Sequence, residues 1–588
     1  MLLRHINIPD LAAIFRRHEG LSPVPYLFDE ACKARARQYA KTSGIWADLD
    51  NRLHPDQPIS VIKRSIYRGY QRTGERAIAQ ARVNERMQEL KRACLALWLE
   101  HPLADTDYLQ DLLWAYCDDW TWVTPAHEGH TIDLGAAKLA ATMAETLHVV
   151  GESLEEEVTQ RVTQEIQRRI FEPFFSCQFA NTWKSVRHNW NHVCNGEIIR
   201  TALYQIEDPR LLANMVHGAI QNLTYGLDGF TEDGGCVEGP GYWDYGFGHY
   251  LYVAQALFFR TGGEINLLAD EKIRRICEYP LATHIDGPLR ATFADSSHGY
   301  LPARLALIVD SFEGMPNLYP LCERLEDGRL RLKDMHELAL YDSEKQVGEL
   351  EDRDWLLPEL GMVKLLGAKG PTPLTLLALA GHNGVNHNHN DIGSFMLYKH
   401  GQLFFVDPGG PVYSRVTFSK DRYRSVFCNS FGHSVPTING CLQELGSEYY
   451  GTLQVENLGG QGRKRAVIDM THAYPSGLVK RLIRSFEIET HTGRLWLEDV
   501  YTFDSAPHSI EEALITFHPV CLSADGASVR IGDEACGMTV TAEGMAGRFA
   551  VMALVEESKE GRTGQTIHRI TFHPEEVQRE MTIRFFFT

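Results

Sequence analysis

The chain has 588 residues, and its 58 Lys and Arg residues against 77 Asp and Glu residues give a formal charge of −19. Apolar residues make up 44% and aromatic residues 10% of the sequence, which excludes an intrinsically disordered protein, and the length predicts more than one domain. The acidic pI near 5.7 argues against a nucleic-acid-binding protein, although one cleft can be locally basic on an acidic protein.

The N-terminal segment does not have the pattern of a signal peptide. Arg4 and the pair Arg16 and Arg17 leave no apolar run long enough for its core. No stretch of about eighteen apolar residues is present, which predicts no membrane span. The 12 cysteines are scattered without CxxC spacing, which favours reduced thiols over a disulfide framework. We therefore expect a cytoplasmic protein, and secretion stays open if a signal segment was removed.

Residues 1–348 are expected to be helical. Apolar side chains recur three, four or seven positions apart, which is typical of helices with one buried face. Short breaks separate these segments, so successive helices should pack as antiparallel pairs in a bundle, a solenoid or a closed toroid. No repeat of fixed period is present, which counts against a regular solenoid. The clearest helical segments are 87–98, 139–147, 154–170, 197–206 and 211–222.

Residues 349–588 have a different pattern, with short segments rich in Val, Ile, Phe and Tyr between Gly, Pro, Asn or Asp. This is typical of antiparallel strands, and roughly 240 residues of them predict a sandwich of two sheets. Helices followed by strands exclude a βαβ fold, and no glycine-rich phosphate loop supports nucleotide chemistry. Because no low-complexity linker separates the halves, we expect a shared interface and a site in the cleft between them.

The densest polar cluster, residues 386–391, opens the β-rich half. On an extended strand His387, His389 and Asp391 would share one face, and two imidazoles with a carboxylate suit a zinc ion. The alternative is a solvated turn in which Asn side chains cap the backbone. A metallo-β-lactamase motif would need a further His where Ile392 stands, so we discount that interpretation.

Two later residues extend the possible metal set. Asp407 ends an apolar strand, and His433 follows in a second polar segment. Asp407, His433 and His389 could meet if their strands are neighbours, although a single histidine is more often a hydrogen-bonded core residue.

The helical half contains two aromatic and polar clusters, at 187–196 and 233–246. Aromatic rings with amides, Arg and Tyr are typical of a sugar site, where rings stack on the sugar and polar groups bind its hydroxyls and carboxylate. The alternative is a helix–loop boundary with core aromatics. The predicted substrate-binding residues are Arg187, Trp190, Glu238 and Trp243.

The strings HNHNDIGSFMLYKHGQLFFVDPGG (387–410) and NSFGHSVPTING (429–440) resemble the C-terminal region of the heparinase II/III-like polysaccharide lyases. HNWNHVCNGE (188–197) and DGGCVEGPGYWDYG (233–246) look like that family's helical domain. The resemblance covers most of residues 150–440, and the domain order agrees. It implies an incomplete (α/α) toroid over 1–348, then an antiparallel β-sandwich over 349–588.

The resemblance also implies the activity and the roles of individual residues. The activity is β-elimination of uronic-acid-containing polysaccharides. His389, Asp407 and His433 match the family's ligands of one structural zinc ion, and His387 matches a catalytic histidine. Asn189 matches the amide that neutralises the uronate carboxylate.

The catalytic tyrosine falls in the segment GYWDY, and we favour Tyr245 over Tyr242 from its distance to Asn189 along the chain. Some family members have a histidine beside the asparagine. Trp190 stands there in this chain, so His192 is a further catalytic candidate. Because His387 and His389 would point the same way on a regular strand, their separate roles require an irregular loop.

Several alternatives stay open. The expected substrate is an acidic oligo- or polysaccharide of the glycosaminoglycan type, and alginate is the alternative. We expect exolytic cleavage of short fragments. A homodimer stays open. A toroid glycoside hydrolase would need two opposed carboxylates, for which Asp233, Glu238, Asp244 and Asp295 are available. A non-catalytic glycan-binding protein and a hydrolase that uses zinc-bound water are the remaining readings. Arg187, Arg200, Arg415, Arg422 and Arg424 lie near the motifs and could meet sulfate or carboxylate.

Overall fold

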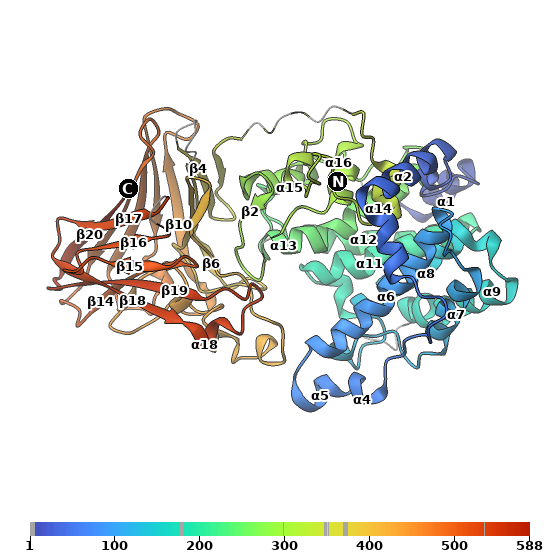
Figure 1. Cartoon of the computed structure of the whole chain (residues 1–588), viewed down its shortest axis with the longest axis horizontal. Coiled ribbons are helices and arrows are strands. Elements are labelled where there is room, and N and C mark those ends of the chain that lie inside the picture. The colour runs from blue at the N-terminus through green and yellow to red at the C-terminus, as the bar shows by residue number, and fades with distance from the viewer. Residues whose placement is uncertain are drawn as a thin grey trace.

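A computed structural model describes residues 6–176, 181–297, 299–345, 348, 350, 352–367, 374–533 and 536–588. Helices occupy the N-terminal part and antiparallel sheets the C-terminal part, side by side (Figure 1), which confirms the predicted order. The last helix of the first part, α17, ends at Leu340, and the first strand of the second part, β3, begins at Trp355. The predicted boundary at 348 and 349 falls between them, and residue 349 lies outside the described residues.

Short polar residues fix where many of the helices begin. Asp133 accepts a hydrogen bond from the backbone N–H of Ala136 at the start of α8, and Asp208 accepts two at the start of α12, ahead of Pro209. The helices are α1 Ile8–Arg17, α2 Glu30–Ser43, α3 Ile45–Arg52, α4 Arg64–Tyr67, α5 Gly69–Thr73, α6 Ala77–Trp98, α7 Thr106–Asp118, α8 Leu134–Val150, α9 Glu156–Ile166, α10 Glu172–Phe175, α11 Asn189–Gln205, α12 Pro209–Leu227, α13 Pro240–Tyr242, α14 Gly248–Arg260, α15 Glu271–Ala282, α16 Ala303–Asp310, α17 Met335–Leu340 and α18 Val555–Ser558.

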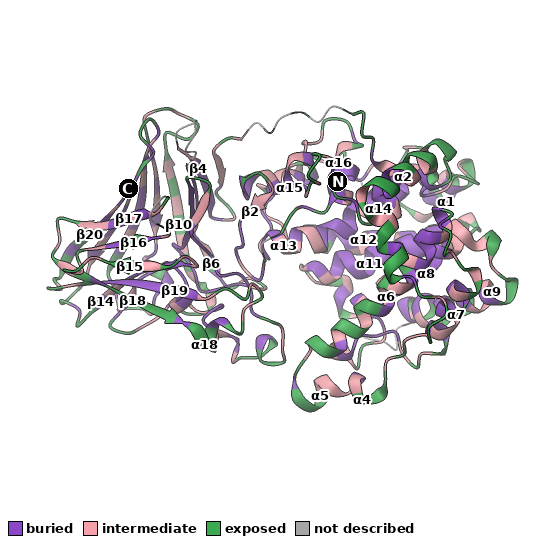
Figure 2. Cartoon of the chain, in the orientation of Figure 1, coloured by how far each residue is buried: buried purple, intermediate pink, exposed green. Residues whose placement is uncertain are grey.

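Helix α11 lies at the centre of the helical half. It contacts α8, α12 and α14, and nearly all of its side chains are buried, so Figure 2 shows it mostly purple. A helix that is buried on all sides shows little amphipathic periodicity. This packing is consistent with the expected incomplete toroid, and it places the N-terminus of α11 at the edge of the helical half that faces the strands.

The strands form three antiparallel sheets in the C-terminal part, not the two that we predicted, and a hairpin of β1 and β2 within the helical half. The orders are β15-β16-β17-β20-β13-β12-β11-β10-β6, β18-β19-β14-β9 and β3-β4-β5-β7-β8. The strands are β1 His284–Asp286, β2 Leu289–Arg290, β3 Trp355–Leu357, β4 Met362–Leu366, β5 Leu374–Leu379, β6 Gly381–Asn383, β7 Phe395–Lys399, β8 Gln402–Phe405, β9 Thr437–Ile438, β10 Gly446–Glu456, β11 Arg463–Asp469, β12 Arg481–Glu489, β13 Arg494–Thr502, β14 Ile510–Thr516, β15 Val520–Leu522, β16 Ser528–Ile531, β17 Met538–Glu543, β18 Gly547–Leu554, β19 Ile567–Pro574 and β20 Glu580–Phe587.

The five-stranded sheet lies between the helical half and the other sheets. In its strand β7, Met396 and Tyr398 pack into the core of the helical half, whereas Phe395 and Leu397 pack into the core of the sheets. A strand covered on both faces needs apolar side chains at every position, which is why β7 is a continuous apolar run. The two halves therefore share a packed interface, as the missing linker predicted.

None of the helices in the described part of the chain combines the length and hydropathy needed to span a membrane. Eleven cysteines are described and all are free thiols, while Cys177 lies outside the described residues.

Candidate active site

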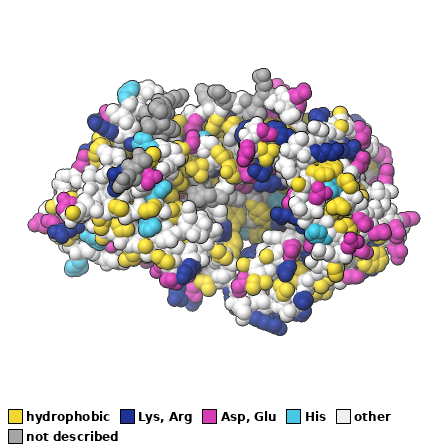
Figure 3. Space-filling view, in the orientation of Figure 1, with side chains coloured by type: hydrophobic (Ala, Val, Ile, Leu, Met, Phe, Trp, Pro, Cys, Tyr) yellow, Lys and Arg dark blue, Asp and Glu magenta, His cyan; other side chains and the backbone are white. Residues whose placement is uncertain are grey.

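A cleft of about 1090 Å³ opens where the helical half meets the loops of the β-rich half. Figure 3 shows the molecule hollowed at this place. Although the whole chain is acidic, six Lys and Arg residues and four Asp and Glu residues line the cleft, so it is locally basic. The Lys and Arg residues are Arg76, Lys91, Lys138, Arg200, Arg304 and Arg562.

Asn189 lines the cleft from the first turn of α11, and Glu238 holds it. The Glu238 carboxylate accepts a 2.8 Å hydrogen bond from the Asn189 backbone N–H and a 3.1 Å hydrogen bond from its Nδ2. An amide nitrogen has two protons, so one Nδ2 proton stays available for another acceptor. Glu238 is itself 5% exposed, and burial raises its pKa. Glu238 therefore lies behind Asn189 and orients the amide.

His387 reaches the cleft from a loop without regular secondary structure, and its own backbone φ is positive, at 59°. Its Nδ1 lies 2.7 Å from Oδ2 of the buried Asp295, and its ring stacks on Tyr242 with centroids 4.0 Å apart. A left-handed backbone at His387 breaks the alternation of a strand. This is the irregular loop that separate roles for His387 and His389 require.

Asp295 is the common partner of four side chains. His387 and His389 approach its two oxygens, Arg422 Nη2 donates to it at 2.8 Å and the Tyr413 hydroxyl at 3.1 Å. Burial alone would raise the Asp295 pKa, but the hydrogen bonds from the histidines and the charge of Arg422 lower it overall. Asp295 is therefore an ionised carboxylate that fixes the orientation of both histidines.

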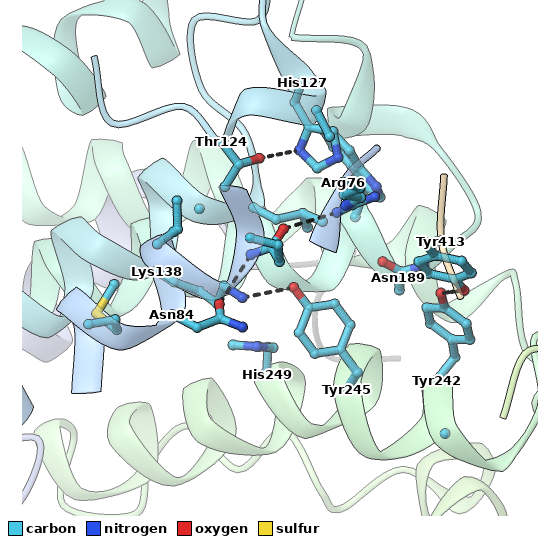
Figure 4. Close-up of a pocket in the computed structure, with 18 of the residues that line it drawn as sticks. Arg76, Asn84, Thr124, His127, Lys138, Asn189, Tyr242, Tyr245, His249 and Tyr413 are labelled. Atoms are coloured by element: carbon cyan, nitrogen blue, oxygen red, sulfur yellow. Dashed lines mark hydrogen bonds between the residues drawn. The ribbon is translucent and has the colours of Figure 1, made fainter. Parts of the chain in front are cut away.

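Tyr242, Tyr245 and Tyr413 are three of the five tyrosines that line the cleft. The Tyr242 and Tyr413 hydroxyl oxygens are 2.5 Å apart, and Arg562 lies over the Tyr413 ring. Burial raises the pKa of Tyr242, and raises that of Tyr413 to about 12, so both stay protonated at neutral pH. The Tyr245 hydroxyl instead points toward Lys138 (Figure 4), whose ammonium group donates to it at 3.1 Å.

Four buried side chains form a candidate metal centre next to Asp295. One ligand atom from each of His389, Asp391, Asp407 and His433 lies within 4.8 Å of the others. His389 Nδ1, His433 Nδ1 and Asp407 Oδ2 are buried without a well-formed hydrogen bond among the described residues, although His433 Nδ1 and Asp407 Oδ2 lie 3.3 Å apart. Buried polar atoms without such bonds are costly, so the convergence of these three atoms fits a cation-binding site.

The second nitrogen of each histidine supports this interpretation. His389 Nε2 lies 3.2 Å from Asp295 Oδ1, and His433 Nε2 lies 3.1 Å from the carbonyl oxygen of Phe427. Metal-bound histidines usually donate their other N–H to a carboxylate or a carbonyl. Two imidazoles and two carboxylates suit tetrahedral zinc. The donor set fits zinc, and Asp391 joins the three ligands that the resemblance implied.

The glycines of the segment VDPGG bring the metal ligands close to Asp295. Gly409 donates its backbone N–H to Asp407 Oδ1 at 2.8 Å and has a φ of 72°, which favours glycine. A Cβ on Gly410 would lie 2.8 Å from the Asp295 Cα atom. Larger residues at these two positions would push the β-rich half away from the segment that carries Asp295.

The structure brings several predicted residues to the cleft and buries others. Trp190 lies in the cleft, with the His127 ring 4.6 Å from its own. Trp243 is fully buried and donates from Nε1 to the Ile276 carbonyl oxygen, so it is a core residue and not a sugar platform. Arg187 is exposed and is not one of the residues that line the cleft.

The structure also places His192 away from the cleft. Its ring is 1% exposed and packs against Phe230, Phe247 and Tyr250. Burial lowers the His192 pKa to about 3, so the ring is neutral. Local sequence could not distinguish this core position from a catalytic one, because His192 is only three residues from Asn189 along α11.

Tyr413 and Lys138 were missed by the sequence analysis. Tyr413 follows the VDPGG segment closely, and its place after a motif of the site was an available signal. Lys138 lies on α8 in an ordinary helical pattern, and nothing local distinguishes it. Asp295 was considered only as a hydrolase carboxylate, yet its four donors make it a positioning group.

The carboxylates that line the cleft are all engaged within the described part of the chain. Glu145 pairs with Arg200 and His336, and Glu197 with Arg200 and His249. Asp334 caps α17, and Asp295 has the four donors described above. A hydrolase needs two opposed carboxylates that are free to act on substrate and water. The described cleft does not offer such a pair.

Of the arginines considered as anion ligands, Arg415 and Arg422 bind within the protein. Arg415 donates to the carbonyl oxygens of Tyr70 and Gln71. Arg200 lines the cleft but is paired with two glutamates, and Arg424 is exposed outside it. None of these four has an unshared charge in the cleft.

Comparison with known proteins agrees with this fold. The chain is similar to a heparinase III structure, with a TM-score of 0.60, 12% identity and coverage of 96% of this chain and 93% of that chain. It is similar to a heparan sulfate lyase from Pedobacter heparinus (TM-score 0.59, 12% identity, 95% and 87% coverage). It is also similar to a chondroitin AC lyase from Streptomyces coelicolor A3 (TM-score 0.52, 9% identity, 99% and 82% coverage). No curated protein matches the sequence significantly.

Residues 353–584 match the family model described as "Heparinase II/III-like, C-terminal". This range contains His387 and the four residues of the candidate metal centre. The β-rich half therefore carries a heparinase II/III-like C-terminal domain, and the chain as a whole has a fold similar to that of heparinase III.

Proposed function

We propose that the protein is a polysaccharide lyase that cleaves uronic-acid-containing glycans by β-elimination. The observation that carries this proposal is the convergence of Asn189, Tyr245 and His387 on one basic cleft. Heparinase III, a heparan sulfate lyase and a chondroitin AC lyase have similar folds, which supports the reaction class. The reaction removes the C5 proton of a uronate, breaks the C4–O4 bond and leaves a C4–C5 double bond.

Asn189 would neutralise the uronate carboxylate. Removal of the C5 proton places negative charge on that carboxylate, and a preorganised donor stabilises it in the transition state. Glu238 accepts one Nδ2 proton, which would leave the other for the uronate carboxylate. Because the amide is already oriented, little reorganisation is needed when charge develops.

His387 would accept the C5 proton. Asp295 binds Nδ1, which leaves Nε2 as the basic nitrogen, as in other carboxylate–histidine pairs. The phenols of Tyr242 and Tyr413 stay protonated at neutral pH because their pKa values are raised, so neither is available to accept this proton. They pack beside the imidazole and keep its ring in place.

Tyr245 would donate a proton to O4 as the C4–O4 bond breaks. Its hydroxyl oxygen accepts from Lys138, and its own proton has no acceptor among the described residues. The hydroxyl of Tyr242 is instead engaged with Tyr413. After donation the Lys138 ammonium group would stabilise the phenolate that remains, since a cation in contact favours the charged form.

His389, Asp391, Asp407 and His433 would hold zinc outside the reacting groups. When bound, the ion would cross-link these loops and contribute folding free energy. His389 shares Asp295 with His387, so the metal centre would position the base without touching substrate.

We propose a glycosaminoglycan fragment as the substrate, with alginate as the alternative, because glycosaminoglycan lyases have similar folds. The test is the absorbance of the unsaturated uronate during incubation with heparan sulfate, hyaluronan, chondroitin and alginate oligosaccharides. We expect new absorbance with at least one of these substrates and its loss in the Asn189→Ala variant. Cleavage without unsaturated product would indicate a hydrolase and would contradict the proposal.

A further inference from the structure

The cleft continues past Tyr245 into a hollow between α6, α8, α14 and α16. Lys91 of α6, Lys138 of α8, Tyr252 of α14 and Arg304 of α16 line it. In Figure 4 Lys138 and His249 lie on the side of Tyr245 away from Tyr242 and Tyr413. This part of the cleft is therefore separate from the groups around His387.

Lys91 has unshared charge in this hollow. Its side chain is exposed to the cleft and makes no hydrogen bond or ion pair with any residue that the structure describes. The protein nevertheless surrounds it closely enough that burial lowers its pKa. An ammonium group with three free donors in such surroundings favours an anionic partner.

Arg304 also has N–H donors that are not used within the described part of the protein. Its guanidinium lies 4.1 Å from the centroid of the Tyr252 ring, and its one ion pair with Asp334 is long, at 3.9 Å. The buried Nε of Arg304 has no partner among the described residues. A guanidinium over an aromatic ring is well placed to bind an oxyanion edge-on.

The acidic residues of the hollow do not cancel these two charges. Glu145 accepts from Arg200 Nη2 at 2.8 Å and from the Tyr204 hydroxyl at 2.6 Å, with His336 at 2.9 Å. Glu197 is bound by Arg200 and His249. Both glutamates are saturated. The third carboxylate, Asp334, accepts the backbone N–H of Glu337 and lies 3.9 Å from Arg304, so Lys91 and Arg304 keep donors for a ligand.

We propose that this hollow is a subsite for an anionic substituent, a carboxylate or a sulfate ester, on the sugar that departs with O4, bound by Lys91 and Arg304. The assignment to that sugar rests on the proposed function, because Tyr245 would protonate O4 and lies between the subsite and Asn189. Tyr252 would form an aromatic wall for the sugar ring. The substrate would then have acidic groups on two successive sugars.

The test compares Lys91→Gln with the wild-type enzyme. Each enzyme is measured on pairs of tetrasaccharides that differ only in the acidic group on the departing sugar. One series of pairs has a carboxylate as this group, and the other has a sulfate ester. We expect KM to rise about tenfold, with kcat changed less than about twofold, only for the substrate that has the group. The series in which the effect occurs identifies the substituent. Lys63→Gln, an exposed lysine outside the cleft, is the matched control.

An unchanged KM, or an equal rise for both members of a pair, would overturn the subsite. If no glycan yields unsaturated product, the proposed function fails, and calorimetry with the same oligosaccharides still tests the subsite. Binding about tenfold weaker in Lys91→Gln would then support an anion site in a protein without lyase activity. Equal affinity of Lys91→Gln and wild type would reject it.

Discussion

The Nδ1 atom of His387 lies 2.7 Å from Oδ2 of Asp295, although 92 positions separate the two residues in the chain. His387 comes from the β-rich half and Asp295 from the segment after hairpin β1–β2 of the helical half. The carboxylate also reaches His389 of the candidate metal centre at 3.2 Å. Asp295 therefore links the proposed base to the metal centre across the boundary between the halves.

Replacing Asp295 with Asn should impair both activity and metal binding. An amide at this position cannot accept from all four donors, so His387 loses its fixed orientation and His389 its second partner. We expect kcat to fall about 100-fold or more and metal affinity to fall about 10-fold. Turnover and zinc content of the purified variant check this. Wild-type turnover with wild-type zinc content would contradict the proposed positioning role.

The two candidate tyrosines should differ when each loses only its hydroxyl. We expect Tyr245→Phe to lower kcat by about 100-fold or more, because the departing O4 loses its proton donor. Tyr242→Phe should have a smaller effect, since its hydroxyl is engaged with Tyr413. Parallel turnover measurements, with circular dichroism as the folding control, separate the roles. The opposite order would assign the acid to Tyr242.

We expect Glu238 to affect catalysis by orienting the Asn189 amide. The Glu238→Gln variant can accept only one of the two hydrogen bonds that now hold Asn189, so the amide is no longer oriented. Loss of one oriented donor to developing charge costs on the order of 100-fold in kcat, and we expect a drop of about that size with a small change in KM. Steady-state kinetics test this, with surface Glu232→Gln as the control. A change in KM alone would mean that Glu238 acts on ground-state binding.

Loss of a zinc ligand should lower stability more than it alters the chemistry. His433→Ala removes one of four buried ligands, and metal binding free energy is then lost from folding. We expect reduced zinc content and a melting temperature lower by several degrees, with the exposed His508→Ala unchanged. Loss of activity on chelation without any change in melting temperature would instead indicate catalysis by metal-bound water.

His192 should affect stability in acid and not catalysis. Its folded pKa, about 3, lies below the unfolded value near 6.5, so between these values the unfolded chain binds more protons. Stability from this group is complete above about pH 6.5 and falls by up to about 1.4 kcal/mol per pH unit as pH decreases toward 3. We expect His192→Gln to flatten this acid limb in denaturant titrations while keeping kcat. Lost activity in a folded variant would return His192 to the site.

The order of helices and strands and most residue types of the site could be predicted from the sequence. Apolar periodicity distinguishes helices from strands. Three candidate metal ligands lie within the short strings HNHND and VDPGG, so they could be recognised locally. The number of sheets could not be predicted, because a strand such as β7 that is buried on both faces has the same local pattern whichever sheets cover it.

The amino-acid order alone indicates that aromatic, amide and imidazole groups are available and that helices precede sheets. Which of these groups meet depends on how the elements pack in three dimensions. Trp243 and His192 are buried in the helical core, whereas Asp295, Tyr413 and Lys138 come to the cleft from segments far apart in the chain. Local periodicity determines which side chains share a face of an element, but the packing of elements against one another decides whether that face meets core or cleft.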